Sequence, residues 1–217
     1  MQHFCTDRDL LGIEPSMFLG GGFPASSLVA GEDGQLSGTS FTSAGSDFPA
    51  GGVQAGMVLT AYGAVPAEGA ALEIVSVDSA TELTVSVLRG AADDEPIAPP
   101  AGAGGKFFVR SYRLQIARVS AALAEKLRRL TEAPGITAAE FADSSQLTAV
   151  TCYGVLAECF TARSAGGDAG DANWIKARHY RELYSGGQLQ LRLAVDADGD
   201  GFAEQTRTLG NVRLRRT

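Results

Sequence analysis

The chain has 217 residues, 45% of them hydrophobic, and a formal net charge of −7. This length suits one domain with an insertion or two small domains, and the hydrophobic content is enough to bury a core. The acidic balance argues against a free-standing nucleic-acid-binding protein, because such proteins usually carry a basic excess.

The composition changes along the chain. Residues 1–110 contain 4 Lys and Arg against 13 Asp and Glu, a net charge of −9, whereas residues 111–217 contain 14 against 12, a net charge of +2. Seventeen of the 27 glycines also lie in the first part. We therefore expect a structural boundary close to Ser111.

The N-terminus lacks the basic start and apolar run of a secretory signal, and no apolar stretch approaches the ~20 residues that span a bilayer. The cysteines are Cys5, Cys152 and Cys159, an odd number without paired spacing, which argues against a disulfide framework. Cys152 and Cys159 would lie roughly 10 Å apart along a helix, beyond disulfide reach. We expect three reduced thiols, a cytoplasmic compartment and no membrane association.

In chain order, the first predicted elements are short helical turns. Thr6 is placed to cap a turn over residues 7–11, and residues 14–18 predict a second turn. Residues 20–22 are three successive glycines without the Lys-Ser/Thr and helix that a phosphate-binding loop needs. We assign residues 1–25 to a helical domain.

Residues 26–110 predict β structure. Alternation of apolar and polar side chains indicates strands over residues 57–61, 72–77, 83–88 and 106–110, with one or two more in residues 26–45. Residues 78–81 have the composition of a hairpin turn. The Pro-, Gly- and Ala-rich segment 91–105, which contains Asp93, Asp94 and Glu95, predicts an exposed, solvated loop.

Beyond Ser111 the period changes from two to that of an amphipathic helix. Pro134-Gly135 would end this helix, a second is predicted over about 145–161, and a third from the N-cap Asp171 to about Tyr184, ended by Gly186-Gly187. The apolar face of the first helix consists of Ile116, Val119, Leu123, Leu127 and Leu130.

The predicted fold class is therefore α+β. It consists of a helical bundle of about three to four helices, an inserted small β-barrel or sandwich-like domain, and a C-terminal β-hairpin. The corresponding parts are residues 1–25 with the helical domain, 26–110 as the β-rich insertion, 111–187 as the helical bundle, and 188–217 as the hairpin and tail.

The hairpin loop has the spacing of a calcium site. Asp196, Asp198 and Asp200 stand at positions 1, 3 and 5 of a loop with Gly201 at position 6, and Glu204 could add an oxygen ligand. Position 12 is Arg207 rather than the Glu of an EF-hand, and the flanking segments predict strands. We favour an acidic turn, since Asp and Gly suit turn geometry, and keep Ca²⁺ binding as an alternative.

No catalytic pattern is evident. His3 and His179 have no catalytic companion in sequence, and no nucleophile elbow or phosphate-binding loop occurs, so we expect a protein that is not an enzyme. Arg213, Arg215 and Arg216 form a basic C-terminal cluster. This cluster suits either docking to an acidic partner or a charged strand edge that blocks edge-to-edge pairing.

The order of these parts resembles the head-tail connector (adaptor) proteins of tailed bacteriophages and prophages. The likeness covers most of the chain and lies in the succession of segments rather than in one motif. The segments are residues 4–11, 14–18, the β-rich stretch 56–88, the helix start 111–116, and the ending over 176–184, 189–195, 196–201 and 212–215.

The resemblance implies a structural virion protein of the phage neck that is synthesised in the host cytoplasm. Such proteins assemble as a homo-oligomeric ring, commonly of twelve subunits, between the portal and the next neck or tail protein, around the channel through which DNA passes. An acidic channel wall would repel phosphates. The alternatives are a calcium-binding interaction module and, third, a small enzyme with a site in the β domain.

Overall fold

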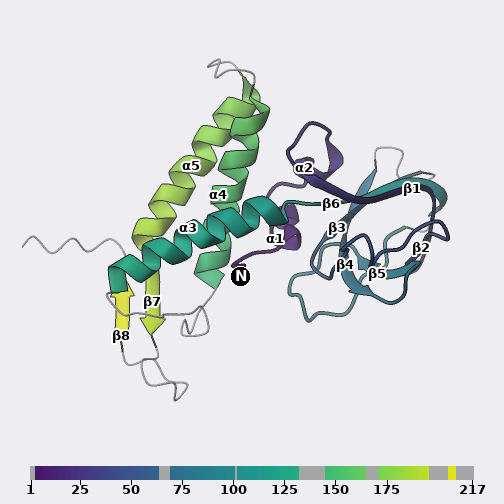
Figure 1. The fold of residues 1–217 in the computed structure, drawn as a ribbon, viewed down its shortest axis with the longest axis horizontal. Coiled ribbons are helices and arrows are strands. Elements are labelled where there is room, and N and C mark those ends of the chain that lie inside the picture. The colour runs from purple at the N-terminus through teal and green to yellow at the C-terminus, as the bar shows by residue number, and fades with distance from the viewer. Residues whose placement is uncertain are drawn as a thin grey trace, which may run out of the picture. The chain divides into compact units, whose positions relative to one another are not determined.

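The computed structural model describes residues 3–63, 69–100, 102–131, 145–164, 171–195 and 205–208 (Figure 1). The chain divides into two compact units. One runs from Thr6 to Leu114, and the other combines Met1–Cys5 with Gln115–Thr217. We call them the barrel unit and the helical unit.

The barrel unit is built on a closed antiparallel barrel with the strand order β1-β2-β5-β4-β3-β6, in which β6 pairs with β1 again. The hairpin turn between β4 and β5 occupies residues 78–81, as the sequence predicts, and the Asp78 carboxylate accepts hydrogen bonds from Ser76 and Thr84 at 2.7 Å each. The strands are β1 (Ser26–Ser37), β2 (Ser40–Thr42), β3 (Val58–Tyr62), β4 (Ala70–Val77), β5 (Glu82–Ser86) and β6 (Gly102–Ser111).

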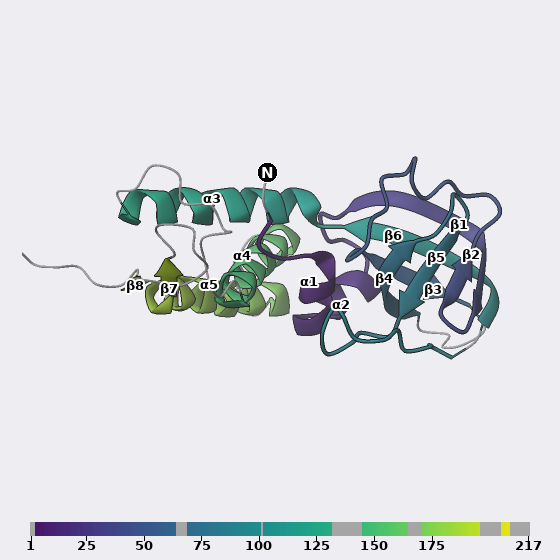
Figure 2. The same ribbon diagram turned by 90° about the horizontal axis from the view of Figure 1, so that it is seen from below.

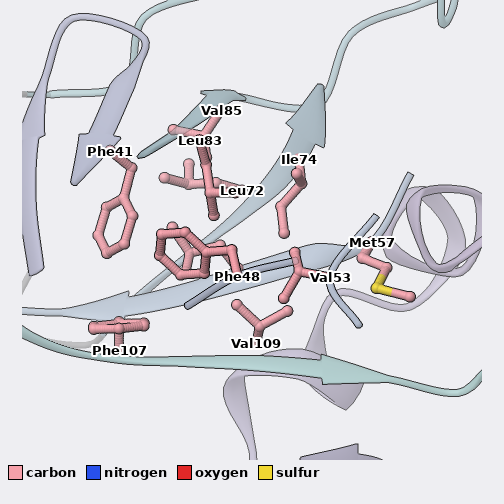
Figure 3. Packing of buried hydrophobic residues seen from close by; sticks show 11 residues of the cluster. Phe41, Phe48, Val53, Met57, Leu72, Ile74, Leu83, Val85, Phe107 and Val109 are labelled. Carbon is pink, nitrogen blue, oxygen red and sulfur yellow. The ribbon is translucent and has the colours of Figure 1, made fainter. Parts of the chain in front are cut away.

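The barrel interior is closed by aromatic rings. Phe41 and Phe107 meet edge to face at 5.0 Å between ring centroids, and Phe48 lies 6.3 Å from each. Side chains from the surrounding strands converge on these rings (Figure 3). Two glycines of β1 make room for them: a Cβ on Gly31 would lie 2.5 Å from the Phe107 ring, and one on Gly34 would lie 2.7 Å from the Phe41 ring.

Two short helices, α1 (Asp7–Ile13) and α2 (Ser16–Leu19), belong to the barrel unit. Thr6 caps α1, as predicted, and its backbone N–H donates to the Asp9 carboxylate at 2.8 Å. The apolar side chains of these helices are buried, and Phe18 packs edge to face on Tyr112 at 5.4 Å. Their burial contributes to the core of this unit.

The helical unit contains α3 (Arg113–Thr131), α4 (Ser145–Arg163) and α5 (Ala172–Gln190). Helices α4 and α5 lie side by side, and α3 crosses them (Figures 1 and 2). Four residues of the predicted apolar face of α3 are buried, namely Ile116, Val119, Leu123 and Leu127. Leu123 and Leu127 pack with Leu147 and Val150 of α4.

Helix α5 is longer than the sequence predicts. We expected it to end at Gly186-Gly187, yet it continues to Gln190, and the following strand begins at Arg192 instead of Gln188. A Cβ on Gly187 would lie 2.9 Å from Val150, and Gln188 and Leu191 are buried. Close packing on α4 therefore outweighs the weak helix propensity of the two glycines.

The predicted fold class is wrong. In the described part of the chain, the principal element is a closed six-stranded antiparallel barrel accompanied by five helices, rather than a helical bundle that carries an inserted β domain. The physical reason lies in the N-terminal segment, whose helices α1 and α2 belong to the barrel unit and have buried apolar residues. Beyond α5, β7 (Arg192–Val195) and β8 (Gln205–Thr208) form a separate two-stranded antiparallel sheet.

Within the described ranges, no helix is long and apolar enough to cross a membrane. All three cysteines are buried, and none of them forms a disulfide bond. Cys152 and Cys159 both lie on α4.

Candidate functional site

The residues predicted to hold calcium lie outside the described part of the chain. This applies to Asp196, Asp198, Asp200 and Glu204, which separate β7 from β8. The basic cluster of Arg213, Arg215 and Arg216 also lies outside it. Both assignments therefore stay predictions. Among the residues that are described, no three His, Cys, Asp or Glu side chains gather closely enough to hold a metal ion.

The helical unit has a groove between its three helices. The groove has a volume of about 810 Å³. Small side chains from α4 dominate its wall. Its lining consists of Arg118, Val119 and Ala122 from α3, Gly154, Ala157, Glu158, Thr161 and Ala162 from α4, and Arg181, Tyr184 and Ser185 from α5.

Gly154 is the point at which the three helices approach one another. A Cβ at this position would lie 2.7 Å from Cγ1 of Val119 on α3 and 3.0 Å from the Tyr184 ring on α5. A real side chain would need one of these neighbours to move. The glycine thus fixes the spacing of the helices, and the small residues that follow it on α4 leave the space beside it unfilled.

Charged groups of the groove lining are mostly exposed. Arg118 pairs with Glu158 at 2.5 Å, and this hydrogen bond raises the pKa of the Arg118 guanidinium. Arg181 donates to the Thr161 hydroxyl at 3.2 Å. Burial raises the pKa of the Tyr184 phenol, so this group stays neutral at physiological pH. The lining therefore holds two positive charges and one negative charge.

A second polar cluster lies in the barrel unit and is buried. The Glu73 carboxylate, fully shielded from solvent, accepts a hydrogen bond from Nε of Arg8 at 2.8 Å and pairs with the Arg89 guanidinium through its other oxygen. Arg8 also donates to the backbone oxygen of Arg89 at 2.7 Å. Because both carboxylate oxygens are engaged, this cluster ties α1 to β4 and is unsuited to proton transfer.

Asp7 is a further buried carboxyl group. It accepts a hydrogen bond from the backbone N–H of Tyr112 at 2.8 Å. Burial raises the pKa of Asp7 to about 6, although the hydrogen bonds from Ser111 and Tyr112 act in the opposite direction. The contact joins the start of α1 to the end of β6, so it is an anchor within the barrel unit.

The two histidines do not form a site in the structure. His3 and His179 are both exposed, and the His179 ring lies 5.4 Å from the Tyr180 ring. Tyr180 in turn stacks on Phe160 at 5.8 Å between centroids. This arrangement packs α5 on α4.

Sequence reasoning missed both the groove and the buried ion cluster. One signal in the sequence could have indicated the groove. Small residues recur at intervals of three and four positions along α4, at Gly154, Ala157 and Thr161, so they share one face of the helix. The signal for the buried ion cluster is weaker. Glu73 lies between Leu72 and Ile74, on the outward side of an alternating strand, where a solvent-exposed charge is expected.

No protein-family model, curated protein or solved structure matches the chain. The function is therefore inferred from the residues and the geometry of the chain itself.

Proposed function

We propose that the protein is a structural subunit of a phage neck, a head-tail connector that assembles with further copies between the portal and the next neck or tail protein. The observation that carries this proposal is the surface of the helical unit, which combines an open groove with two exposed apolar side chains on α5. A subunit that packs against neighbours on several sides needs such surfaces.

Two large apolar side chains are exposed on one face of α5. Ile175 is 57% exposed and Leu189 is 61% exposed. They are 14 residues apart, close to four helical turns, so they lie on the same face with Arg178 and Glu182 between them. Burial of these side chains against another chain would be favourable.

The order of the sequence segments supports the same function. The opening stretch 4–18, the helix start 111–116 and the ending 176–201 follow one another as in connector proteins. The net charge of −7 suits a channel through which DNA slides, because a negative wall repels phosphates.

The proposal is tested with the purified protein and the portal protein of its own phage. Sedimentation velocity over a range of concentrations and electron microscopy of mixtures with portal report the assembly state. We expect concentration-dependent oligomers, or rings that form only on the portal. A protein that stays monomeric at every concentration and does not bind the portal would overturn the proposal.

A further inference from the structure

The groove of the helical unit favours an acidic occupant. The groove lining has one more positive than negative charge, since Glu158 is paired with Arg118 while Arg181 bonds only to neutral groups among the contacts seen, the Thr161 hydroxyl and the Trp174 ring. The walls between these charges are Ala, Gly and Val, which suit an aliphatic side chain.

The barrel unit has a segment whose acidic and aliphatic side chains complement the basic and small apolar residues of the groove. The loop between β5 and β6 exposes Asp93, Asp94 and Glu95 in succession. Two residues further on, Ile97 is 52% exposed, and Val87, which pairs with it across a β-bridge, is 40% exposed. Three carboxylates next to an exposed aliphatic pair match a groove with basic rims and small apolar walls.

This loop is held in one shape by the barrel unit. The backbone N–H of Ile97 donates to the Ser86 hydroxyl at 2.7 Å, and the N–H of Ala91 donates to the Asp94 carboxylate at 2.7 Å. The Arg89 guanidinium, already fixed by Glu73, donates to the backbone oxygen of Asp94. A segment ordered before binding loses less conformational entropy when it docks.

We propose that the groove of one copy receives the loop formed by residues 91–97 from the barrel unit of a second copy. Asp93 and Glu95 face the rim arginines Arg118 and Arg181, and Ile97 enters between the small residues of α4. The occupant is a second copy because the acidic excess of the chain lies in residues 1–110 and the basic excess in residues 111–217.

A contact between two different surfaces is heterologous, so it repeats from copy to copy and closes into a ring if the rotation allows. The inference rests on the proposed function for the presence of several copies. It adds which surfaces meet, and it predicts that association weakens at about 1 M salt, where the Debye length is about 3 Å.

The first test uses charge reversal on each side of the contact. We expect Arg181→Glu and Glu95→Lys each to weaken self-association, in solution or on the portal, by more than about tenfold, since like charges then face each other. Arg178→Glu is the matched control, because it makes the same change on α5 outside the groove lining and should associate like the wild type. Ala162→Trp fills the groove without a change of charge and should also prevent association.

The second test mixes the two impaired variants. Arg181→Glu retains an intact loop and Glu95→Lys retains an intact groove, so the mixture regains the wild-type contact of Glu95 with Arg181. The other contact places the introduced lysine opposite the introduced glutamate, so its charges are opposite as well. We expect the mixture to associate although each variant alone associates weakly, as measured by sedimentation velocity. A mixture that stays monomeric, as it would if the loop occupied the groove of its own chain, overturns the inference.

The outcomes separate the inference from the proposed function. If all four variants form the same oligomers as the wild type, the subunits meet through other surfaces: the inference fails and the connector function stands. If the wild type neither associates nor binds the portal, both fail. Circular dichroism of each variant verifies that a loss of association is not a loss of fold.

Discussion

The barrel unit and the helical unit use small residues in opposite ways. In the barrel, Gly31 and Gly34 face inward and the space above them is taken by the rings of Phe107 and Phe41. In the helical unit, Gly154 brings three helices together, and Ala157 and Ala162 then leave a groove that no described side chain fills. The first arrangement serves stability, whereas the second leaves a surface on which another chain can pack.

The two units also differ in the solvent exposure of their ion pairs. Glu73 in the barrel unit is buried between two guanidinium groups. The Arg118–Glu158 pair of the helical unit is largely exposed, with 68% and 37% of the two side chains open to solvent. Matched substitutions in the two units therefore test whether this contrast holds.

The largest effect is expected in the barrel core. Phe107→Ala removes a fully buried ring and should lower the free energy of unfolding by roughly 3–5 kcal/mol. Its neighbour Phe108 is partly buried and holds Tyr62 and Arg110 around its ring, so Phe108→Ala should cost only about 1 kcal/mol. Urea denaturation compares the two, and equal losses would mean that the barrel interior is not closed around Phe107.

The second effect concerns the buried ion cluster. Glu73→Gln removes the carboxylate that pairs with the buried Arg89, and it leaves Arg8 with only the more distant Asp9 at 3.8 Å, so it should destabilise the protein by roughly 3–5 kcal/mol. Glu158→Gln makes the same change in the exposed pair and should cost less than about 1 kcal/mol. Thermal and urea denaturation measure both, and a Glu73→Gln variant as stable as Glu158→Gln would contradict the assignment of Glu73 as a buried anchor.

The third effect is a pH dependence that originates in the barrel unit. The pKa of Asp7 is raised from 3.8 to about 6 in the folded protein, so folding favours the protonated form. Its contribution to stability is fully present below about 3.8 and is lost as the pH rises through about 6. At 1.36 kcal/mol per pKa unit, the loss between pH 4 and pH 7 is about 2 kcal/mol. Asp7→Asn should remove it, as measured by urea denaturation across this range.

Asp33 provides a control, because its pKa is shifted in the opposite direction to that of Asp7. Hydrogen bonds from the Ser43 hydroxyl and the Gly45 N–H lower the pKa of this exposed carboxylate. The stability it contributes is present above the unfolded pKa of 3.8 and is lost as the pH falls below it. Relative to the wild type, Asp33→Asn should therefore gain stability on acidification while Asp7→Asn loses it. Parallel profiles for the two variants would rule out the assignment to Asp7.

Local patterns in the sequence are enough to predict many elements. The alternation in residues 72–77 and 83–88 and the turn at 78–81 predict the β4–β5 hairpin, because a half-buried strand needs period-two alternation. The spacing of Ile116, Val119 and Leu123 likewise predicts the buried face of α3. These predictions rest on residues close in the chain.

Features that depend on distant residues were not predicted. The helical signals in residues 7–18 predict that this segment belongs to the helical domain. Met17 and Phe18 are instead buried in the barrel unit. Periodicity identifies the apolar face of a helix but does not identify the element on which that face packs. The sequence predicts a solvent-exposed Glu73, whereas in the structure this residue is paired with Arg8 and Arg89, which are distant from it in the chain. The groove depends on the spacing of three helices, which sequence does not specify.

The smallest predicted effect tests that spacing directly. Gly→Ala in a helix interior is normally favourable by about 1 kcal/mol. Gly186 on α5 has nothing within 4 Å of an added Cβ, so Gly186→Ala should gain about this amount. At Gly154 the added Cβ would lie 2.7 Å from Val119 and 3.0 Å from Tyr184, and overpacking of this kind costs roughly 1–3 kcal/mol.

Gly154→Ala should therefore be less stable than Gly186→Ala by about 1–3 kcal/mol, in contrast to their equal intrinsic propensities. Urea denaturation of the two variants measures this difference. If both gain stability equally, α3 and α5 do not approach α4 at Gly154, and the walls of the groove are further apart than the structure places them. A loss confined to Gly154→Ala means that this glycine sets the distance between the helices on which the groove depends.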